Sequence, residues 1–299
     1  MSTAPPATVD AALTAARDLG VDRLDAQWLL AHHLGTSRSW LLAHRTDPLP
    51  ADIGALFLAD LRRRADGVPL AYLTGEREFH GLPLRITPEV LDPRPDTETL
   101  VDWALELLGT ELAAVDAPEV VDLGTGSGAI ALAVKHACTR TRVRALDASP
   151  AALAVARANG VRLGLAVDWL ASDWWSALPP PQAHLALSNP PYIAAADPHL
   201  PSLRHEPRAA LTPGADGLAA LRAVIAGAAA HLQPAGWLLL EHGHDQADAV
   251  RRLLADAGFE RIATRRDLGG NERCSGGRRI PETGELLATY RKHGTDEQA

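Results

Sequence analysis

The segment Asp122-Leu-Gly-Thr-Gly-Ser-Gly128 decides the fold, because it joins an apolar run at Val120–Leu123 to a helical pattern over Ala129–Ala137. Glycines let the backbone turn sharply and approach a ligand closely, and the helix start that follows offers unpaired N–H donors. A strand, a glycine-rich turn and a helix in this order indicate an adenosine-type ligand at the edge of a sheet. A P-loop is excluded, since no Gly-Lys-Ser/Thr sequence follows.

The chain beyond this turn alternates between strand and helix patterns. Ser149 is expected to cap one helix ahead of Pro150, and Asn159-Gly160 to end it. Repeated strand–helix units predict an α/β fold with a mainly parallel sheet covered on both faces. The expected strands are 143–146, 167–171, 184–188, 236–241 and 259–264, and the expected later helices are 218–232 and 245–257.

The first 75 residues have helical patterns and no clear strands. Helices are expected over 10–19, 24–34 and 53–64, and the second should bury a stripe of Leu24, Trp28, Leu29 and His32. Next, Glu76–His80 and Leu82–Thr87 flank Gly81, which predicts a β-hairpin between two domains. The expected division is 1–75 helical domain, 76–92 hairpin linker, 93–280 main α/β domain and 281–299 polar tail.

Composition narrows the class of protein. The chain has 299 residues, of which 46% are hydrophobic and 22% charged, so a disordered protein is excluded. No apolar run approaches the ~20 residues of a membrane helix, and the N-terminus has no secretory pattern. Two cysteines, Cys138 and Cys274, are too few for a disulfide framework and suit a reducing cytoplasm. The net charge of −8 disfavours bulk binding of nucleic acid.

Asp147 follows Gly128 by 19 residues and lies at the carboxyl end of the second expected strand. A carboxylate at this position can accept hydrogen bonds from both hydroxyls of a ribose. Gly124, Gly126 and Ala129 also satisfy the dinucleotide pattern G-x-G-x-x-G/A, so an NAD-type cofactor fits the turn as well. No metal site is expected, because His242 and His244 lack partners at ligand spacing and are interpreted as structural or surface residues.

A second motif, Ser188-Asn-Pro-Pro-Tyr192, follows the expected strand 184–188 and therefore reaches the same edge of the sheet. Two prolines fix the backbone and remove two N–H donors, which leaves carbonyl oxygens as acceptors. Asn189 adds a side-chain carbonyl and Tyr192 a flat face for stacking. Such a turn suits a planar NH₂ group whose two hydrogens are held while its nitrogen faces an electrophile.

With these motifs, the sequence resembles the S-adenosylmethionine-dependent methyltransferases that act on amide or amino nitrogens. More narrowly, it resembles the bacterial release factor glutamine N5-methyltransferases, the HemK or PrmC family. The segment Pro93-Arg-Pro-Asp-Thr-Glu98, placed after a helical N-terminal domain, is more specific for this family than the Asn-Pro-Pro-Tyr turn. The resemblance rests on Pro93–Glu98, Asp122–Leu132, Ser172–Trp174, Ser188–Ile193, Leu239–Gly243 and Asn271–Arg273, in the family's order.

The resemblance implies a Rossmann-like seven-stranded methyltransferase sheet with a small N-terminal helical domain joined by a hairpin. It implies that S-adenosylmethionine is bound by Gly124, Thr125, Gly126, Ser127, Gly128, Asp147, Asp173, Trp174 and Asn189. It also implies that the glutamine side chain is held by Asn189, Pro190, Pro191 and Tyr192, with Asn189 and Tyr192 as the catalytic residues. The implied partners are class I peptide chain release factors, whose Gly-Gly-Gln loop carries that glutamine. Asp96 and Glu98 are interpreted either as part of this site or as helix-capping acids, with Asp96 or Thr97 at the N-cap.

Two other functions remain open at this point. An adenine-N6 methyltransferase of DNA or RNA would use the same Asn-Pro-Pro-Tyr turn and stack a flipped base on Tyr192. The acidic net charge and the lack of an evident basic recognition domain count against it. An NAD-dependent dehydrogenase or a non-catalytic scaffold would explain the glycine turn but would give the Asn-Pro-Pro-Tyr turn no purpose.

Overall fold

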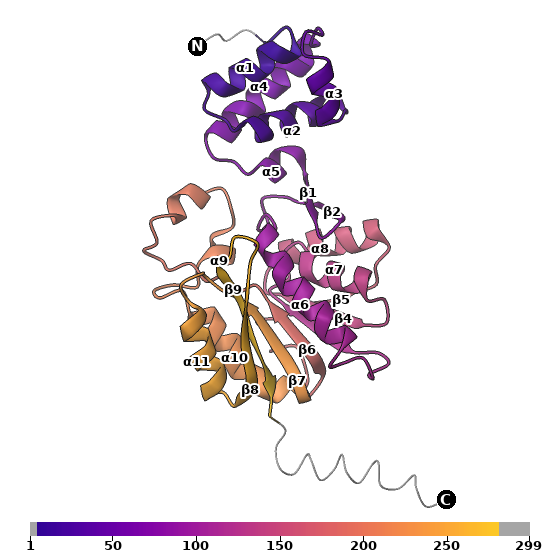
Figure 1. The fold of residues 1–299 in the computed structure, drawn as a ribbon, viewed down its shortest axis with the longest axis vertical. Coiled ribbons are helices and arrows are strands. Elements are labelled where there is room, and N and C mark those ends of the chain that lie inside the picture. Colours follow the sequence, from indigo (N-terminus) through magenta and orange to yellow (C-terminus); the bar gives the residue numbers. More distant parts are fainter. Residues whose placement is uncertain (1–4, 281–299) are drawn as a thin grey trace, which may run out of the picture.

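The computed structural model describes residues 5–280, so the expected tail at 281–299 lies outside the described residues. A small helical module stands at one end of the molecule and a larger α/β unit at the other (Figure 1). Within the module, the ends of three helices are fixed by side-chain caps from Thr8, Asp22 and Ser37. Its elements are α1 (Val9–Asp18), α2 (Arg23–Leu34), α3 (Arg38–Ala43), α4 (Ala51–Ala65) and α5 (Leu70–Thr74).

Two expectations for the helical module were wrong. The sequence pattern missed α3 and α5, which have only six and five residues and so show no full apolar period. The expected buried stripe of α2 was also misplaced, since Leu24 and Trp28 are 52% and 53% exposed. Of the expected stripe only Leu29 is buried, and the helix turns it into the bundle with Leu30 and Ala26, where α1 and α4 pack.

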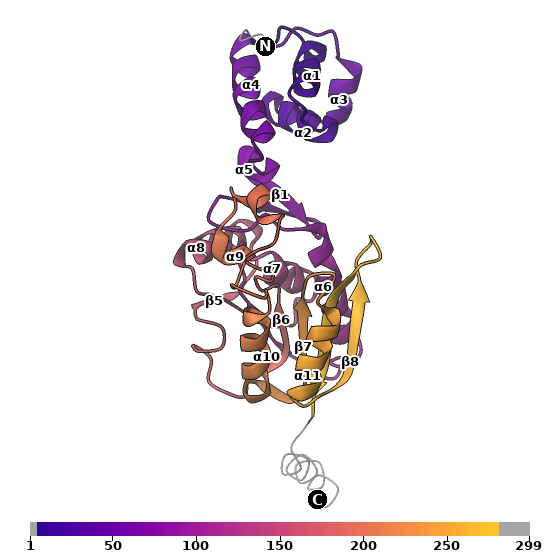
Figure 2. The same cartoon turned by 90° about the vertical axis from the view of Figure 1, so that its left-hand side faces the viewer.

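The expected hairpin is confirmed: β1 (Glu76–Phe79) pairs antiparallel with β2 (Leu82–Arg85) between the module and the α/β unit (Figure 2). A short 3₁₀ turn, η1 (Pro95–Thr97), then leads into α6 (Glu98–Gly109). Phe79 and Leu84 of the hairpin are buried in the same core as Leu100 of α6. The hairpin is thus packed onto the sheet domain and is not a free connection.

Seven strands form one sheet in the order β5-β4-β3-β6-β7-β9-β8. All neighbours are parallel except those of β9, which runs antiparallel to β7 and β8. Six of these strands were expected, and β9 was not. The strands are β3 (Glu119–Leu123), β4 (Arg142–Asp147), β5 (Asp168–Ala171), β6 (Ala183–Ser188), β7 (Leu232–Glu241), β8 (Phe259–Arg266) and β9 (Glu272–Arg279).

Helices cover both faces of the sheet because successive strand residues point to opposite sides. On one face, Val120 of β3 packs in a cluster with α6, α7 (Ala129–Ala137) and the start of α8 (Pro150–Leu163). On the other, Val121 packs with α10 (Ala219–His231) and α11 (Ala247–Asp256). Two short turns, η2 (Leu200–Leu203) and α9 (Arg208–Leu211), lie in the segment after β6. Within residues 5–280, no helix has the length and apolar character needed to cross a membrane.

The end of α8 corrects a further expectation. The helix continues through Asn159 and Gly160 and ends at Gly164, which has a left-handed backbone with φ 66°. Asn159 is fully buried and its amide bonds the backbone N–H and C=O of Arg85 at 2.7 and 3.0 Å, as well as Ser127 O at 3.0 Å. The Asn-Gly pair is therefore a tertiary contact between α8, the hairpin and the glycine turn, and does not stop the helix.

Candidate active site

A cavity of about 300 Å³ opens at the carboxyl ends of the strands, next to β3. The strand order reverses at β3, because β4 and β5 follow on one side of it and β6 lies on the other. This reversal of strand order is where open α/β sheets bind their ligands. The cavity brings together residues from motifs that are far apart in the chain. The predicted residues on its wall are Gly124, Thr125, Gly126, Ser127, Asp147, Asp173, Trp174, Asn189 and Pro191.

Three predicted residues do not line this cavity. Gly128 lies behind the turn at the start of α7, where an added Cβ would come within 3.1 Å of Leu132 and Trp169. Pro190 is buried. Tyr192 is turned away, with its hydroxyl 3.2 Å from Glu241 Oε1. Gly128 thus shapes the turn, and Tyr192 ties the segment after β6 to Glu241 at the end of β7.

The glycine-rich turn is held by the neighbouring strand. Gly124 N and Thr125 N both donate to Leu146 O, at 2.8 and 2.9 Å, and Gly126 N donates to Asp147 Oδ2 at 2.9 Å. The second oxygen of Asp147 accepts from Ser149 N at 2.8 Å. Each carboxylate oxygen keeps a further lone pair, and Asp147 lies on the cavity wall, so it can still accept hydrogen bonds from a ligand's hydroxyl groups.

Asp122 stabilises the same turn from inside the protein. It is fully buried, and its Oδ2 accepts from Thr125 Oγ1 at 2.6 Å and from Ala131 N at 3.2 Å. Burial raises the pKa of Asp122 to about 7, although both of these hydrogen bonds favour the charged form. This carboxyl belongs to the quoted glycine motif, but it acts on the turn and does not line the cavity.

The wall after β5 is formed by Asp173 and Trp174. Trp174 has φ 46°, a left-handed conformation that is strained for a residue with a large side chain. Ser172 holds it there by donating its hydroxyl to Trp174 O at 2.7 Å. The adjacent Trp175 is 5% exposed and donates its indole N–H to Val224 O at 2.9 Å, so it is the core aromatic of the pair.

Asn189 is held by residues that sequence reasoning did not select. Its Nδ2 donates to Thr97 Oγ1 at 3.2 Å. Thr97 stands at the N-cap of α6, as one of the two expected candidates, but its side chain makes no cap hydrogen bond. Its hydroxyl instead interacts with Glu241 at the end of β7. The pattern that could have identified both residues is their place in the Pro93–Glu98 and Leu239–Gly243 motifs.

Glu241 is 1% exposed, and burial raises its pKa to about 7. The Thr97 hydroxyl, Arg273 and Tyr192 act in the opposite direction, because they lower this pKa.

Arg273 of β9 reaches Asp267 at 3.1 Å and Asp96 at 3.3 Å. Asp96 therefore pairs with an arginine and does not cap the helix. Glu98 accepts a hydrogen bond from His80 N at 2.9 Å and so holds the hairpin.

The segment after β6 closes one side of the cavity and connects the two parts of the molecule. Pro207, Ala209 and Ala210 line the cavity, and Glu206 accepts from Arg94 at 2.5 Å. Just before them, Arg204 and His205 contact Asp66 at the end of α4, at 2.7 and 3.3 Å. This segment, residues 199–210, thus contacts both the helical module and the wall of the site.

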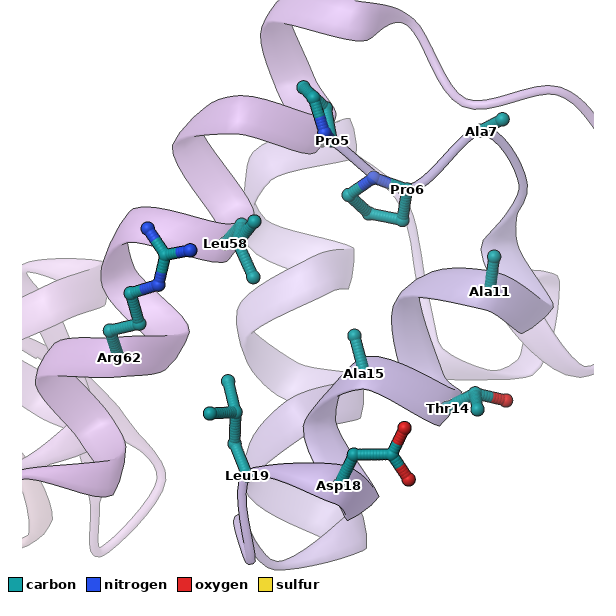
Figure 3. Close-up of a pocket in the computed structure, with 10 residues that line it drawn as sticks. All are labelled: Pro5, Pro6, Ala7, Ala11, Thr14, Ala15, Asp18, Leu19, Leu58 and Arg62. Atoms are coloured by element: carbon teal, nitrogen blue, oxygen red, sulfur yellow. The ribbon is translucent and has the colours of Figure 1, made fainter. Parts of the chain in front are cut away.

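A second concavity of about 490 Å³ lies in the helical module, between α1, α4 and the stretch Pro5–Ala7 (Figure 3). Its polar side chains are Thr14, Asp18 and Arg62, and none of the sequence motifs reaches it. It offers no set of groups suited to the chemistry of a reaction.

In residues 5–280, no cluster of His, Cys, Asp or Glu is arranged to hold a metal ion. His242 is buried against Ser275 Oγ at 2.8 Å, a structural contact.

The cavity wall fits S-adenosylmethionine. The turn at Gly124–Gly126 presents backbone without side chains, and an added Cβ at Gly126 would meet nothing within 4 Å, so a ligand can lie against it. Asp147 suits the ribose hydroxyls. Asp173 suits an adenine amine, and the Trp174 ring, 3.6 Å from the Cβ position of Gly124, offers an aromatic face. All of them line one cavity.

Two known protein families match this chain, one over the helical module and one over part of the α/β unit. Residues 9–75 match the family described as the PrmC N-terminal domain, and residues 97–205 match the methyltransferase small domain. The chain is 52% identical over 263 residues to the release factor glutamine methyltransferase of Bordetella pertussis, covering 87% of this chain and 96% of the relative.

Solved structures share the fold at low identity. The catalytic domain of hMettl16 in complex with a 3′UTR hairpin aligns with a TM-score of 0.53 at 16% identity, covering 80% of this chain and 85% of that one. A Thermus thermophilus 16S rRNA methyltransferase in complex with AdoMet and guanosine aligns with a TM-score of 0.50 at 19% identity, covering 68% and 49%. These likenesses show a methyltransferase fold. The match to the methyltransferase small domain agrees with S-adenosylmethionine as the cofactor that the cavity wall fits.

Proposed function

The chain belongs to the release factor glutamine methyltransferase family, and from this premise we propose its reaction. The enzyme transfers a methyl group from S-adenosylmethionine to the side-chain amide nitrogen, N5, of the glutamine in the Gly-Gly-Gln loop of class I peptide chain release factors. The observation that carries the proposal is that Asn189, Gly124 and Asp147 line one cavity. An acceptor suited to an amide NH₂ therefore lies beside a wall suited to the cofactor.

S-adenosylmethionine supplies the methyl group from its sulfonium. The glutamine amide nitrogen is a weak nucleophile because its lone pair is delocalised into the carbonyl. In the proposed mechanism, Asn189 Oδ1 accepts a hydrogen bond from the amide NH₂ and so orients the nitrogen, while Pro190 is buried behind the cavity wall and keeps the turn rigid. Positioning of this kind supplies much of the rate advantage, and the acceptor also stabilises positive charge that grows on nitrogen.

The remaining residues take supporting roles in this proposal. The turn residues 124–127 face the methionine end of the cofactor, Asp147 its ribose, and Asp173 and Trp174 its adenine. Pro191 lines the same cavity, where it shapes the entrance for the glutamine side chain. Tyr192 acts through its hydrogen bond to Glu241, so its contribution is to hold the turn and not to contact the reacting atoms.

We also propose that the helical module, residues 1–75 in the sequence division, recognises the release factor. Leu24 and Trp28 of α2 and Leu56 of α4 are more than half exposed, which leaves apolar surface for a partner. The segment 199–210 connects this module to the cavity through Asp66 and Arg94. We propose that the enzyme meets the release factor in the cytoplasm, because its two free thiols, Cys138 and Cys274, suit a reducing compartment.

The alternative function, adenine-N6 methylation of DNA or RNA, is not favoured, because the relatives are named release factor glutamine methyltransferases. Incubation with S-adenosylmethionine labelled on its methyl group separates the two. The substrates are a release factor, the same factor with the Gly-Gly-Gln glutamine replaced, and DNA or RNA. We expect label on the intact release factor alone. Label on nucleic acid, or on the glutamine-replaced factor, would contradict the proposal.

A further inference from the structure

Thr97 has one hydroxyl hydrogen and two polar neighbours, Asn189 and Glu241. A threonine hydroxyl donates one hydrogen and offers two lone pairs. Thr97 Oγ1 lies 3.2 Å from Asn189 Nδ2 and also interacts with the Glu241 carboxyl. The residue is 4% exposed and makes no cap for α6. Its polar group therefore serves the site and not the helix.

Glu241 decides where this hydrogen goes. An ionised carboxylate can only accept hydrogen bonds. Oε1 of Glu241 accepts from the Tyr192 hydroxyl at 3.2 Å, while Oε2 has no hydrogen-bond partner within residues 5–280. A buried carboxylate oxygen without a donor is costly, so the Thr97 hydroxyl is drawn to donate to Glu241. Only a lone pair of Thr97 Oγ1 then remains for Asn189.

We infer that Thr97 and Glu241 are positioning residues that fix which end of its amide Asn189 presents to the substrate, an inference that rests on the proposed function. Because Thr97 can only accept from Asn189, Asn189 turns its NH₂ toward Thr97. Its Oδ1 then faces the cavity, as the acceptor that a substrate NH₂ requires.

The need for this arrangement follows from the shape of the amide. The two orientations of an asparagine side chain fill the same volume, so packing alone does not distinguish them, and only hydrogen bonds do. In the flipped orientation Asn189 would point its N–H groups at the substrate NH₂, donor against donor. The inference also gives the Pro93–Glu98 segment a role, since η1 carries Thr97 to the turn after β6.

Three variants test the inference. Thr97→Val keeps the shape and removes the hydroxyl, and Thr97→Ser keeps the hydroxyl. In Glu241→Gln the amide oxygen keeps the hydrogen bond from the Tyr192 hydroxyl, which turns the NH₂ group toward Thr97 as a donor and frees the Thr97 hydrogen to point at Asn189. The matched control is Thr141→Val: Thr141 is 1% exposed, donates to Cys138 O at 2.7 Å, and precedes β4 at the opposite edge of the sheet.

We expect kcat on the release factor to fall roughly tenfold to a hundredfold in Thr97→Val and Glu241→Gln, the range typical for partners that orient a ligating or reacting group. The dissociation constant of S-adenosylmethionine should change much less than kcat, because Thr97 lines the cavity beside Asn189, away from the glycine turn and Asp147, and Glu241 does not line it. Thr97→Ser should keep most of the wild-type kcat. Thr141→Val should keep the wild-type kcat as well, although its free energy of unfolding should fall about as much as that of Thr97→Val.

The pH profile gives a readout that a purely structural role would not change. Only ionised Glu241 enforces the orientation, and its pKa is raised to about 7 by burial, with Arg273, Asp96, Tyr192 and Thr97 around it. Wild-type kcat should therefore fall as the pH drops through this value, and Glu241→Gln should lack this step. If Thr97→Val keeps wild-type kcat while Asn189→Ala is inactive, the inference is wrong and the proposed function stands. If wild type does not methylate the release factor, the proposed function itself fails.

Discussion

The two halves of the active site are built in different ways. In the cofactor half, backbone N–H groups of the glycine turn donate to Leu146 O and to the Asp147 carboxylate at the end of β4, which also accepts from Ser149 N. In the substrate half, Asn189 depends on side chains from η1, β7 and β9. The first half can therefore be recognised from one short motif, whereas the second exists only after the sheet is assembled. We expect substitutions in the two halves to affect different kinetic constants.

The largest expected effect is in the substrate half. Asn189→Ala removes the side-chain acceptor for the substrate NH₂, and kcat should fall about 10²- to 10³-fold, as when one preorganised hydrogen-bonding group is lost from a transition state. Calorimetric titration should show S-adenosylmethionine binding close to that of wild type. A variant that methylates the release factor at the wild-type rate would remove Asn189 from the reaction.

The opposite pattern is expected in the cofactor half. Asp147→Ala removes the carboxylate proposed to hold the ribose, at a cost of about 2 kcal/mol for hydrogen bonds to a charged group. The dissociation constant of S-adenosylmethionine should rise roughly 30-fold by this estimate, while kcat at saturating cofactor changes much less. A loss confined to kcat in Asp147→Ala would mean that the two halves are not separable.

A smaller effect is expected where the cofactor half meets the hairpin. Asn159→Ala leaves Arg85 N–H and two carbonyls without their buried partner. The free energy of unfolding should fall by about 1–3 kcal/mol, measured by urea denaturation. Since Asn159 does not line the cavity, kcat should change far less than in Asn189→Ala. An unchanged midpoint of unfolding would show that this contact does not support the glycine turn.

A further difference between the halves concerns the pH dependence of stability. Burial raises the pKa of Asp122 to about 7 from an ordinary value near 3.8, so the folded protein holds this proton more tightly than the unfolded chain. The group therefore lowers stability progressively as the pH rises from about 4 to 7, and not further above that. Asp122→Asn should show a flatter decline of Tm over this window. An identical pH dependence in both proteins would contradict the raised pKa.

The contrast between the halves also explains how far the sequence could predict the structure. Strong local patterns, such as the apolar run that precedes Gly124 or the Ser149-Pro150 pair at a helix start, predicted six of the seven strands. They also predicted most helices of the α/β unit. The strand β9 was missed because it contains Gly276 and Gly277 next to two arginines, which is a poor strand pattern. Its composition is set by packing: a Cβ on Gly276 would lie 2.4 Å from Leu239 Cδ2.

The same reason applies to the site. Gly124, Asp147 and Asn189 could be predicted because each belongs to a motif with local chemistry. Thr97 and Glu241 also lie in motifs, but their roles could not be predicted, since the contact that gives them significance forms only when α6 and β7 come together beside Asn189. Thr97 by itself is typical of a helix cap, and Glu241 of a strand end, and neither pattern reveals a hydrogen bond across the fold.

The central claim is that the site delivers a methyl group to one amide nitrogen. The most direct test is to react the full-length enzyme with S-adenosylmethionine and an intact release factor, digest the product, and locate the methyl group by tandem mass spectrometry. The account predicts a single methyl group on the side-chain nitrogen of the glutamine in the Gly-Gly-Gln loop, absent when Asn189→Ala replaces the wild-type enzyme. A methyl group on another residue, or equal modification by Asn189→Ala, would contradict it.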